Sequence, residues 1–363
     1  MRQDVRERLK KISELYPPER LRASRERIRR LWRGEQALDR RPFVLIPPSF
    51  SYYDDVFEPE QGLIAYLDDF IAHGLADDDY IPGFFTGCRM GALPSLFGAR
   101  EVIAGGDYCS ERIIRDAQDV FTLPDPRIRP GSAAAKWLEA QRFYLEQTEG
   151  EIAVHANDMQ GMLDVCGQLW GYDNVLAAPY EDEEAYRCLM DKATRAFIYL
   201  WREQERTLGK CFMPTHLYAW DSVPPQNGAT LSADALVMLS PDFFVTWYQP
   251  YLERVSDELG GLTVHSCGNF SQVAAPLCGV RGLRGINASQ MDVGQLLAAG
   301  ADREKVFIFL CPFGQAEALA RRARADNLRV SPTITQCWPE DFATTGRSLL
   351  KRRVDQLKAW FSV

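Results

Sequence analysis

The chain of 363 residues lacks the features of several common classes. It has no run of about eighteen apolar residues, so we expect no membrane-spanning helix. The first eight residues contain no apolar stretch, so we expect no secretory signal. The nine cysteines show no short repeating spacing, which predicts reduced thiols in a cytoplasmic protein. Neither G-x-G-x-x-G nor G-x-x-x-x-G-K-[ST] occurs, so nothing supports a dinucleotide or P-loop site.

Charge is distributed unevenly along the chain. Residues 1–42 carry fourteen Lys or Arg and seven Asp or Glu, so the net charge of −8 leaves −15 on residues 43–363. An acidic body argues against a nucleic-acid groove. Within the basic segment, apolar residues recur at helical spacing and Pro17-Pro18 interrupts the pattern. This predicts two amphipathic helices packed on the body, rather than an arm that binds nucleic acid. The apolar positions are Leu9, Ile12, Leu15, Tyr16, Leu21, Ile28, Leu31 and Trp32.

Strand-like and helix-like segments alternate after this extension. Alternating β and α units imply parallel strands, and eight such units predict a (β/α)₈ TIM barrel over residues 42–363, preceded by a helical extension over residues 1–41. A doubly wound open sheet is the alternative. Many Gly and Pro residues predict an insertion around residues 86–142. The expected strands are residues 42–46, 80–85, 152–157, 212–218, 262–267, 283–287, 306–311 and 329–334.

One pair of side chains stands out at the end of the fifth expected strand. His265 and Cys267 are two residues apart, and such positions share one face of a strand. An imidazole and a thiolate are ligands that zinc prefers. Cys311, at the end of the seventh strand, and Cys337, just after the eighth, are the candidates for a third ligand. We favour Cys337, because it lies among polar residues in a turn, whereas Cys311 has the apolar surroundings of a packed thiol.

Polar residues gather where the other expected strands end. In a barrel these ends share one rim, which is the face that carries active sites. We therefore expect the main pocket near His265, lined by residues that are distant in sequence. They are Asn157, His216, Tyr218, Trp220, Asp221, Asn269 and Asn287.

Several segments together resemble the uroporphyrinogen decarboxylase superfamily, and within it the zinc-containing methyltransferases that act on corrinoid proteins. The resemblance covers roughly residues 80–355. Its most specific parts are Val264-His-Ser-Cys-Gly-Asn269, which resembles a His-x-Cys-Gly-Asn zinc motif, and Gln336-Cys337-Trp-Pro-Glu340, which resembles a late cysteine before a helix. Weaker segments are 80–99, 162–171 with 180–186, and 239–244 with 249–251.

The resemblance implies a set of functional expectations. Zinc would lie on His265, Cys267 and Cys337, and methylcobalamin would be the co-substrate. From their place at the predicted rim, and not from the resemblance, we expect Asp221 and His216 to act in catalysis and the other rim residues to bind substrate. The expected partners are a corrinoid protein, a small-molecule methyl acceptor and, as an option, a second copy in a homodimer; neither nucleic acid nor a membrane is expected.

The chain also departs from the family pattern. No Glu occurs in residues 286–292, where some relatives place a zinc ligand, so water, Gln290, Asp292 or the substrate is left for the fourth position. The arginine-rich signature of the decarboxylases is absent, which argues against a porphyrinogen decarboxylase. A lyase acting on a tetrapyrrole or related acid, and a protein that binds a corrinoid or metabolite without turnover, stay as alternatives.

Overall fold

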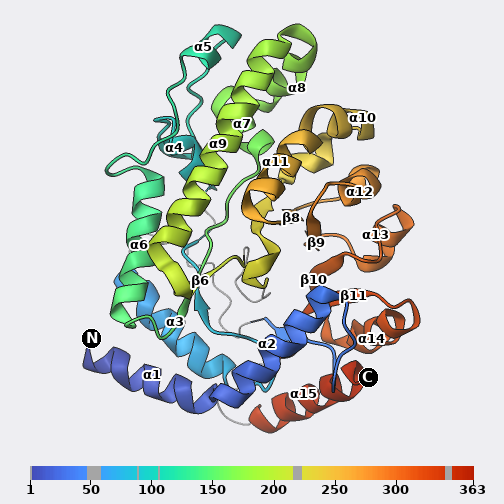
Figure 1. Ribbon diagram of the computed structural model, residues 1–363. Coiled ribbons are helices and arrows are strands. Elements are labelled where there is room, and N and C mark those ends of the chain that lie inside the picture. The colour runs from blue at the N-terminus through green and yellow to red at the C-terminus, as the bar shows by residue number, and fades with distance from the viewer. Residues whose placement is uncertain (1, 47–58, 88–89, 105–106, 216–222, 340–345) are drawn as a thin grey trace.

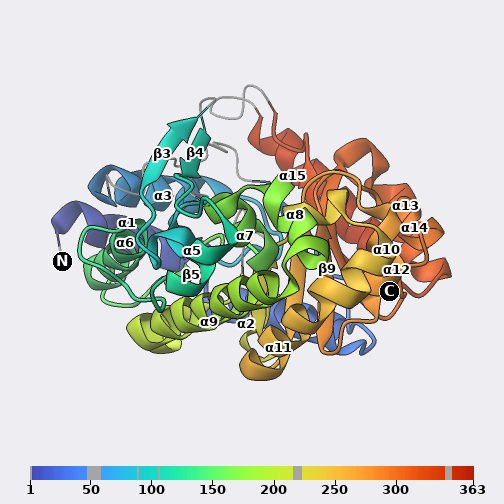
Figure 2. The same cartoon turned by 90° about the horizontal axis from the view of Figure 1, so that it is seen from above.

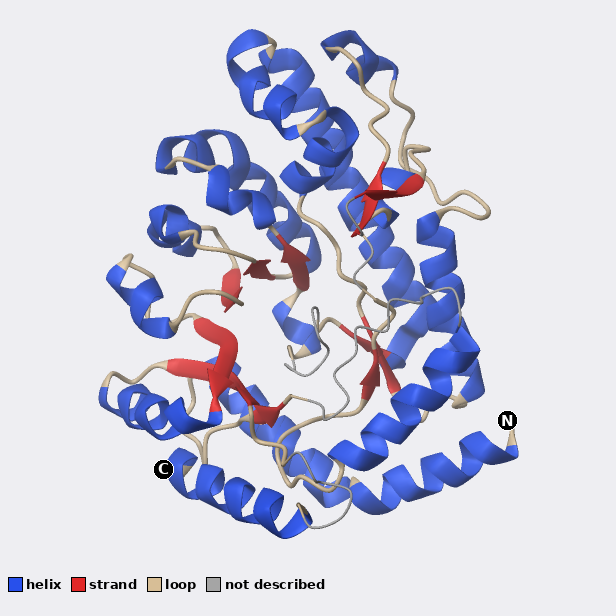
Figure 3. Ribbon diagram, turned by 180° about the vertical axis from the view of Figure 1, so that it is seen from behind, coloured by secondary structure: helices blue, strands red, loops and turns tan. Residues whose placement is uncertain are grey.

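Parallel strands lie at the centre of the molecule and helices surround them, as Figures 1 and 3 show. The structure is a computed structural model that describes residues 2–46, 59–87, 90–104, 107–215, 223–339 and 346–363. The strands are β1 (Val44–Leu45), β2 (Gly83–Phe84), β3 (Glu101–Ala104), β4 (Asp107–Ser110), β5 (Ala153–His155), β6 (Phe212–Met213), β7 (Ala229–Ser232), β8 (Leu262–Ser266), β9 (Leu283–Ala288), β10 (Val306–Pro312) and β11 (Arg329–Thr335).

The helices lie mostly between consecutive strands. The α-helices are α1 (Gln3–Leu15), α2 (Pro18–Arg33), α3 (Pro59–His73), α4 (Ala92–Ser95), α5 (Ala117–Thr122), α6 (Ala133–Gln147), α7 (Met162–Trp170), α8 (Tyr172–Glu181), α9 (Glu183–Leu208), α10 (Pro241–Phe243), α11 (Gln249–Leu259), α12 (Ser271–Cys278), α13 (Val293–Ala298), α14 (Ala316–Ala325) and α15 (Arg347–Phe361). Short 3₁₀ turns are η1 (Gly209–Cys211), η2 (Pro225–Asn227), η3 (Asp234–Met238) and η5 (Phe313–Gln315), and η4 (Phe244–Tyr248) is a π-helix. Within the part of the chain that the structure describes, none of these helices is long and apolar enough to cross a membrane.

The strands form a mixed α/β fold with two parallel sheets. One sheet has six strands in the order β1-β11-β10-β9-β8-β7, and the other has three in the order β2-β5-β6. The closed (β/α)₈ barrel is therefore not confirmed, because no ladder joins the two sheets into one over the described residues. Each of the eight expected strands overlaps an observed one. A ninth parallel strand, β7, was not predicted, because its four residues include Thr230 and Ser232 and follow a Pro- and Gly-rich turn without a clear alternation.

The two N-terminal helices pack on the body as their pattern predicts. α1 ends at Leu15 and α2 starts at Pro18, on either side of the predicted break. Val5, Leu9 and Ile12 of α1 belong to the main apolar core of the molecule. The division between an extension and a barrel domain at residue 42 stays a prediction.

The segment between β2 and β5 has elements of its own. It holds α4, the antiparallel β3–β4 hairpin, α5 and α6, and Figure 2 shows the hairpin at the edge of the molecule. The Gly- and Pro-rich stretch predicted as an insertion thus contains short regular elements rather than one long loop.

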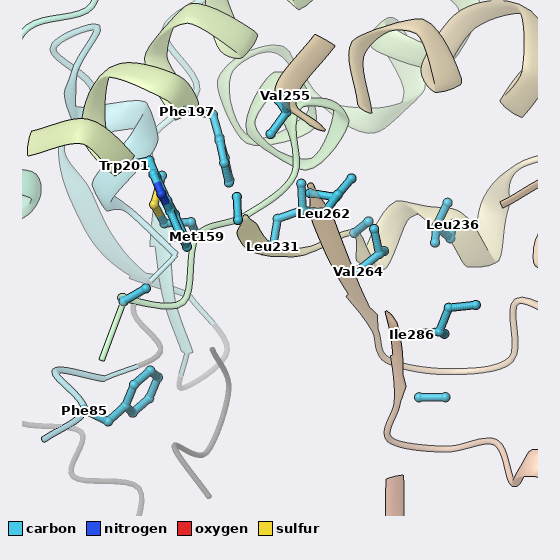
Figure 4. Packing of buried hydrophobic residues seen from close by; sticks show 14 of the residues in the cluster. Phe85, Met159, Phe197, Trp201, Leu231, Leu236, Val255, Leu262, Val264 and Ile286 are labelled. Carbon is cyan, nitrogen blue, oxygen red and sulfur yellow. The ribbon is translucent and has the colours of Figure 1, made fainter. Parts of the chain in front are cut away.

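The packing around β8 determines which of its side chains face the helices. Leu262 and Val264 are buried and lie beside Val255 of α11, Leu231 of β7 and Leu236 of η3, as Figure 4 shows. Burying an aliphatic side chain of this size contributes about 1.5–3 kcal/mol. Because side chains alternate along a strand, His265 points to the opposite face from Leu262 and Val264. The apolar packing of β8 therefore directs the imidazole away from the helix layer.

Candidate metal centre

His265 and Cys267 lie together at the carboxyl end of β8. Nε2 of His265 is 3.3 Å from Sγ of Cys267, so the predicted proximity of this pair is present in the structure. His265 is 2% exposed and Cys267 is partly buried. Gly268, with a φ of +77°, turns the chain immediately after the pair, which a residue with a side chain adopts only with strain. The strand thus ends in a tight turn that leaves both ligand atoms at its rim.

Asn287 orients the imidazole of His265. The two residues are paired across β8 and β9, and Nδ1 of His265 lies 3.1 Å from Oδ1 of Asn287. An amide oxygen accepts, so Nδ1 donates its proton there and the lone pair of Nε2 faces Cys267. A hydrogen bond from the second ring nitrogen to an oxygen is the usual support of a metal-binding histidine. The structure therefore gives Asn287 a positioning role, and its expected contact with substrate stays a prediction.

Asp234 completes a group that the sequence did not reveal. One ligand atom each from Asp234, His265 and Cys267 lies within 4.8 Å of the other two, and among the described residues these three form a set that could hold a metal ion. Oδ1 of Asp234 also accepts the backbone N–H of Cys267 at 2.7 Å. Asp234 starts η3, directly after the unpredicted strand β7. The missed strand explains the missed ligand, since only β7 brings residue 234 beside β8.

Backbone hydrogen bonds keep η3 in this position. The N–H of Ala233 donates to the carbonyl oxygen of His265 at 2.7 Å, and the N–H of Ala235 donates to Oδ1 of Asp164 at 2.9 Å. Asp164 is completely buried in α7, and burial, together with the nearby charge of Asp234, raises its pKa to about 8. The residues before and after Asp234 are thus both anchored, which fixes its carboxylate against the end of β8.

The donor set fits a borderline metal such as zinc. It offers one imidazole nitrogen, one sulfur and one carboxylate oxygen, all of which zinc accepts. Burial raises the pKa of the Cys267 thiol, and the carboxylates of Asp234 and Asp158 raise it further, while Ser289, whose hydroxyl donates to the sulfur at 3.6 Å, lowers it. Without a cation the sulfur therefore stays protonated, and a bound cation would displace that proton. Three protein ligands leave one coordination position open, as in catalytic rather than structural zinc sites.

The structure does not bring Cys337 or Cys311 into this group. Both sulfurs are buried in the main apolar core, and burial raises the pKa of each thiol to about 12. The expectation that the polar sequence around Cys337 leaves it unpacked is wrong, because the side chain is 0% exposed. Gln336 has a φ of +60°, and the carbonyl oxygen of Cys337 accepts a hydrogen bond from Arg353 of α15 at 2.7 Å. The chain therefore turns toward α15 after β11, and a metal-binding role for Cys337 stays a prediction.

Asn157 and Asn269 both make hydrogen bonds that support the local fold. Asn157 is completely buried, and its Oδ1 accepts hydrogen bonds from Thr86 and, at 3.3 Å, from Gln141. Asn269 is exposed, and its Oδ1 accepts the backbone N–H of Ser271 at 3.0 Å at the start of α12. Their expected roles in substrate binding stay predictions.

The remaining expected site residues are the two options for the fourth zinc ligand and four residues of the predicted rim. Asp292, one option for the fourth ligand, caps α13, where its Oδ1 accepts the backbone N–H of Gln295 at 2.9 Å. Gln290, the other protein option, is not one of the ligand types that make up the group around Cys267. The four rim residues lie outside the described residues: His216, Tyr218, Trp220 and Asp221.

Comparison with known proteins supports the fold. No protein-family model matches the chain, and no curated protein matches it. Among solved structures, a methyltransferase from Methanosarcina mazei matches with a TM-score of 0.61 and 13% sequence identity, over 91% of this chain and 97% of that one. At this identity the match shows a shared fold over nearly the whole of both chains. It does not confirm the resemblance to the uroporphyrinogen decarboxylase superfamily.

Proposed function

We propose that this protein is a zinc-dependent methyltransferase that moves a methyl group between a corrinoid and a thiol or similar acceptor. The observation that carries the proposal is the group formed by Asp234, His265 and Cys267 at the carboxyl end of β8. The fold shared with a protein named as a methyltransferase supports it. A corrinoid protein as partner and a cytoplasmic location belong to the same proposal.

We also propose that the two parallel sheets are parts of one closed barrel of the (β/α)₈ type, in which β7 is a strand beyond the eight expected. Isolated contacts bridge the gaps between them: Gln160, after β5, pairs with Ser232 of β7, and the N–H of Asp79, before β2, donates to the carbonyl oxygen of Phe43 at 3.1 Å. The hydroxyl of Thr230 in β7 also donates to the carbonyl oxygen of Pro214, after β6, at 2.6 Å. In a barrel the carboxyl ends of the strands form the catalytic face, which is where the candidate metal centre lies.

In this proposal His265, Cys267 and Asp234 bind the metal, and Asn287 orients the imidazole of His265. His265 presents Nε2, because Asn287 holds the proton of the imidazole on Nδ1. Cys267 presents its sulfur on the same face of β8, and Asp234 supplies an oxygen and also holds the backbone of Cys267. When bound, zinc would lower the pKa of an acceptor thiol while leaving its sulfur nucleophilic. Cys337 stays the alternative to Asp234 as the third ligand in this proposal, which would require the turn at residues 336–338 to rearrange.

The overall reaction balances without a further reactant. The acceptor sulfur loses its proton to solvent and attacks the methyl carbon of methylcobalamin in line. A carbon–sulfur bond forms while the cobalt–carbon bond breaks, and the electron pair of that bond stays on cobalt, which leaves as cob(I)alamin. Such a reaction would need room for the acceptor on one side of the methyl carbon and for the large planar corrinoid on the other.

Metal content and methyl transfer test the proposal together. Protein purified without chelator should contain about one zinc per chain by mass spectrometry, and Cys267→Ala should lose most of it. Cys278→Ala is the matched control, since Cys278 is a partly buried cysteine of α12 that belongs to no such group among the described residues. Wild-type protein should demethylate methylcobalamin in the presence of small thiols, followed by its visible absorbance. If the purified protein contains no zinc, the proposal is wrong, and the lyase and the non-catalytic binding protein are the functions that are left. If it contains zinc but transfers no methyl group, the non-catalytic binding protein is the function that is left.

A further inference from the structure

A cavity lies at the opposite end of the strands from the candidate metal centre. It has a volume of about 480 Å³, within the usual range for small-molecule sites. Its walls come from the end of α2, the start of β11 and the end of α14, elements that meet near the C-terminus in Figure 1. β8 to β11 are parallel, so the cavity beside Arg329, the first residue of β11, is at the amino edge of the sheet. It is therefore separate from the site around Cys267.

Three arginines in this cavity have no acidic partner. Arg41, Arg324 and Arg329 line it, and within the described chain no carboxylate lies within ion-pair distance of their guanidinium groups. Burial lowers the pKa of Arg41, and the nearby positive charge of Arg324 lowers it further. Like charges in one cavity repel one another, and a bound anion would offset this repulsion.

Main-chain contacts hold two of these guanidinium groups in place. Arg41 donates to the carbonyl oxygen of Leu328, and Arg324 donates to that of Ser362 at 3.2 Å. A carbonyl orients a guanidinium but does not neutralise its charge, and each arginine has five N–H donors. Several donors on each group are therefore left for a ligand, in positions that are already ordered.

A glycine makes room for the third arginine. Gly34 ends α2 with a φ of +68°, and a Cβ there would lie 2.2 Å from Nη2 of Arg329. The guanidinium of Arg329 can therefore occupy this space only because residue 34 has no side chain. The lack of a side chain at residue 34 thus allows Arg329 to lie at the cavity wall.

The other charged side chains of the cavity are already paired. Arg27 contacts Asp39 at 2.6 Å and Asp79 at 2.9 Å. Glu35 contacts Arg29 at 3.2 Å, and Arg30 and Arg33 at 3.8 Å. Val363, whose α-carboxylate ends the described chain, also lines the cavity and offsets one positive charge, so the three arginines without an ion-pair partner still leave an excess of positive charge.

We propose that this cavity binds a small phosphate-bearing anion through Arg41, Arg324 and Arg329. A phosphate group offers several oxygens to converging guanidinium groups, and arginine binds such oxygens in a bidentate geometry. The site does not depend on the proposed methyl transfer, because it shares no residue with the candidate metal centre. The phosphate can belong to free pyrophosphate or to a nucleotide, and the experiment separates these sources.

Isothermal titration calorimetry on the full chain at low salt tests this site. Pyrophosphate is the first probe and ADP the second, and tighter binding of either one identifies the source of the phosphate. Arg329→Gln and Arg324→Gln should each weaken binding about tenfold or more, the loss expected for a charge-assisted hydrogen bond. Arg303→Gln is the control, because Arg303 is an exposed arginine before β10 that does not line the cavity.

The outcomes decide for or against the cavity. Arg324 is exposed on α14, so its substitution leaves the core intact, and circular dichroism confirms the fold of each variant. Binding that weakens in both cavity variants and not in Arg303→Gln supports the site. No binding of either probe by the wild type, or an equal loss in the control variant, overturns it.

Discussion

Acidification should destabilise this protein through one buried histidine. His155 of β5 is 1% exposed, and neither ring nitrogen has a hydrogen-bond partner among the described residues. Its ring packs against the backbone of β2, where a Cβ at Gly83 would lie 1.9 Å from Nε2. Burial lowers the pKa of His155 from 6.5 to about 3. The folded protein therefore keeps this imidazole neutral at a pH where the unfolded chain protonates it.

The sign and size of the effect follow from this difference. Between pH 6.5 and about 3 the unfolded state binds more protons, so the free energy of unfolding falls as the pH falls through this range. At 1.36 kcal/mol per pKa unit, the contribution of His155 that is lost between pH 7 and pH 5 is about 2 kcal/mol. Above pH 7 the histidine should contribute no further dependence.

Urea denaturation at pH 7 and pH 5, followed by circular dichroism, measures this contribution. His155→Leu keeps an apolar side chain of similar size and cannot titrate. The decrease in unfolding free energy from pH 7 to pH 5 should be about 2 kcal/mol smaller in the variant than in the wild type, because all other groups are shared. A difference below about 0.5 kcal/mol would show that the ring has a water or polar partner, and would refute the reasoning.

Two further predictions concern the surroundings of the candidate metal centre. Asn287→Ala should weaken zinc binding about 10- to 100-fold, because the proton on Nδ1 of His265 loses its acceptor; a chelator competition titration measures this, and unchanged affinity would contradict the positioning role. Asp164 has a pKa raised from 3.8 to about 8, so the folded state holds its proton where the unfolded state has lost it, and stability falls as the pH rises from 4 to 8. Asp164→Asn keeps an oxygen for the N–H of Ala235 and should be more stable than the wild type at pH 9 by about 1 kcal/mol or more. Urea midpoints at pH 5 and pH 9 test this, and parallel pH profiles of the two proteins would contradict it.

Local patterns predicted the secondary structure well. The amphipathic spacing and the two prolines located α1 and α2, and short apolar runs located eight strands. The His265–Cys267 pair was also predictable, because two residues at i and i+2 share a strand face whatever the rest of the fold does. Predictions of this kind depend on neighbours within one turn or one strand.

Contacts between distant segments could not be predicted in the same way. β7 is four residues long and has weak strand character alone, so its pairing with β8 depends on the sheet and not on its own sequence. Without β7, the proximity of Asp234 to Cys267 was not predictable. Cys337 is a second example of this limit. Its neighbours in the sequence are polar, but its side chain is buried in the folded protein.

Most helices and strands and one pair of ligand atoms could be predicted from local sequence, since backbone geometry and side-chain alternation act over a few residues. The position of Asp234 beside this pair and the contact of Asn287 with the imidazole depend on how distant segments pack. The tertiary structure also decided that Arg41 and Arg329, which are distant in sequence, line one cavity. These arrangements depend on strand order, register and helix packing, which sum many weak contacts over the whole chain.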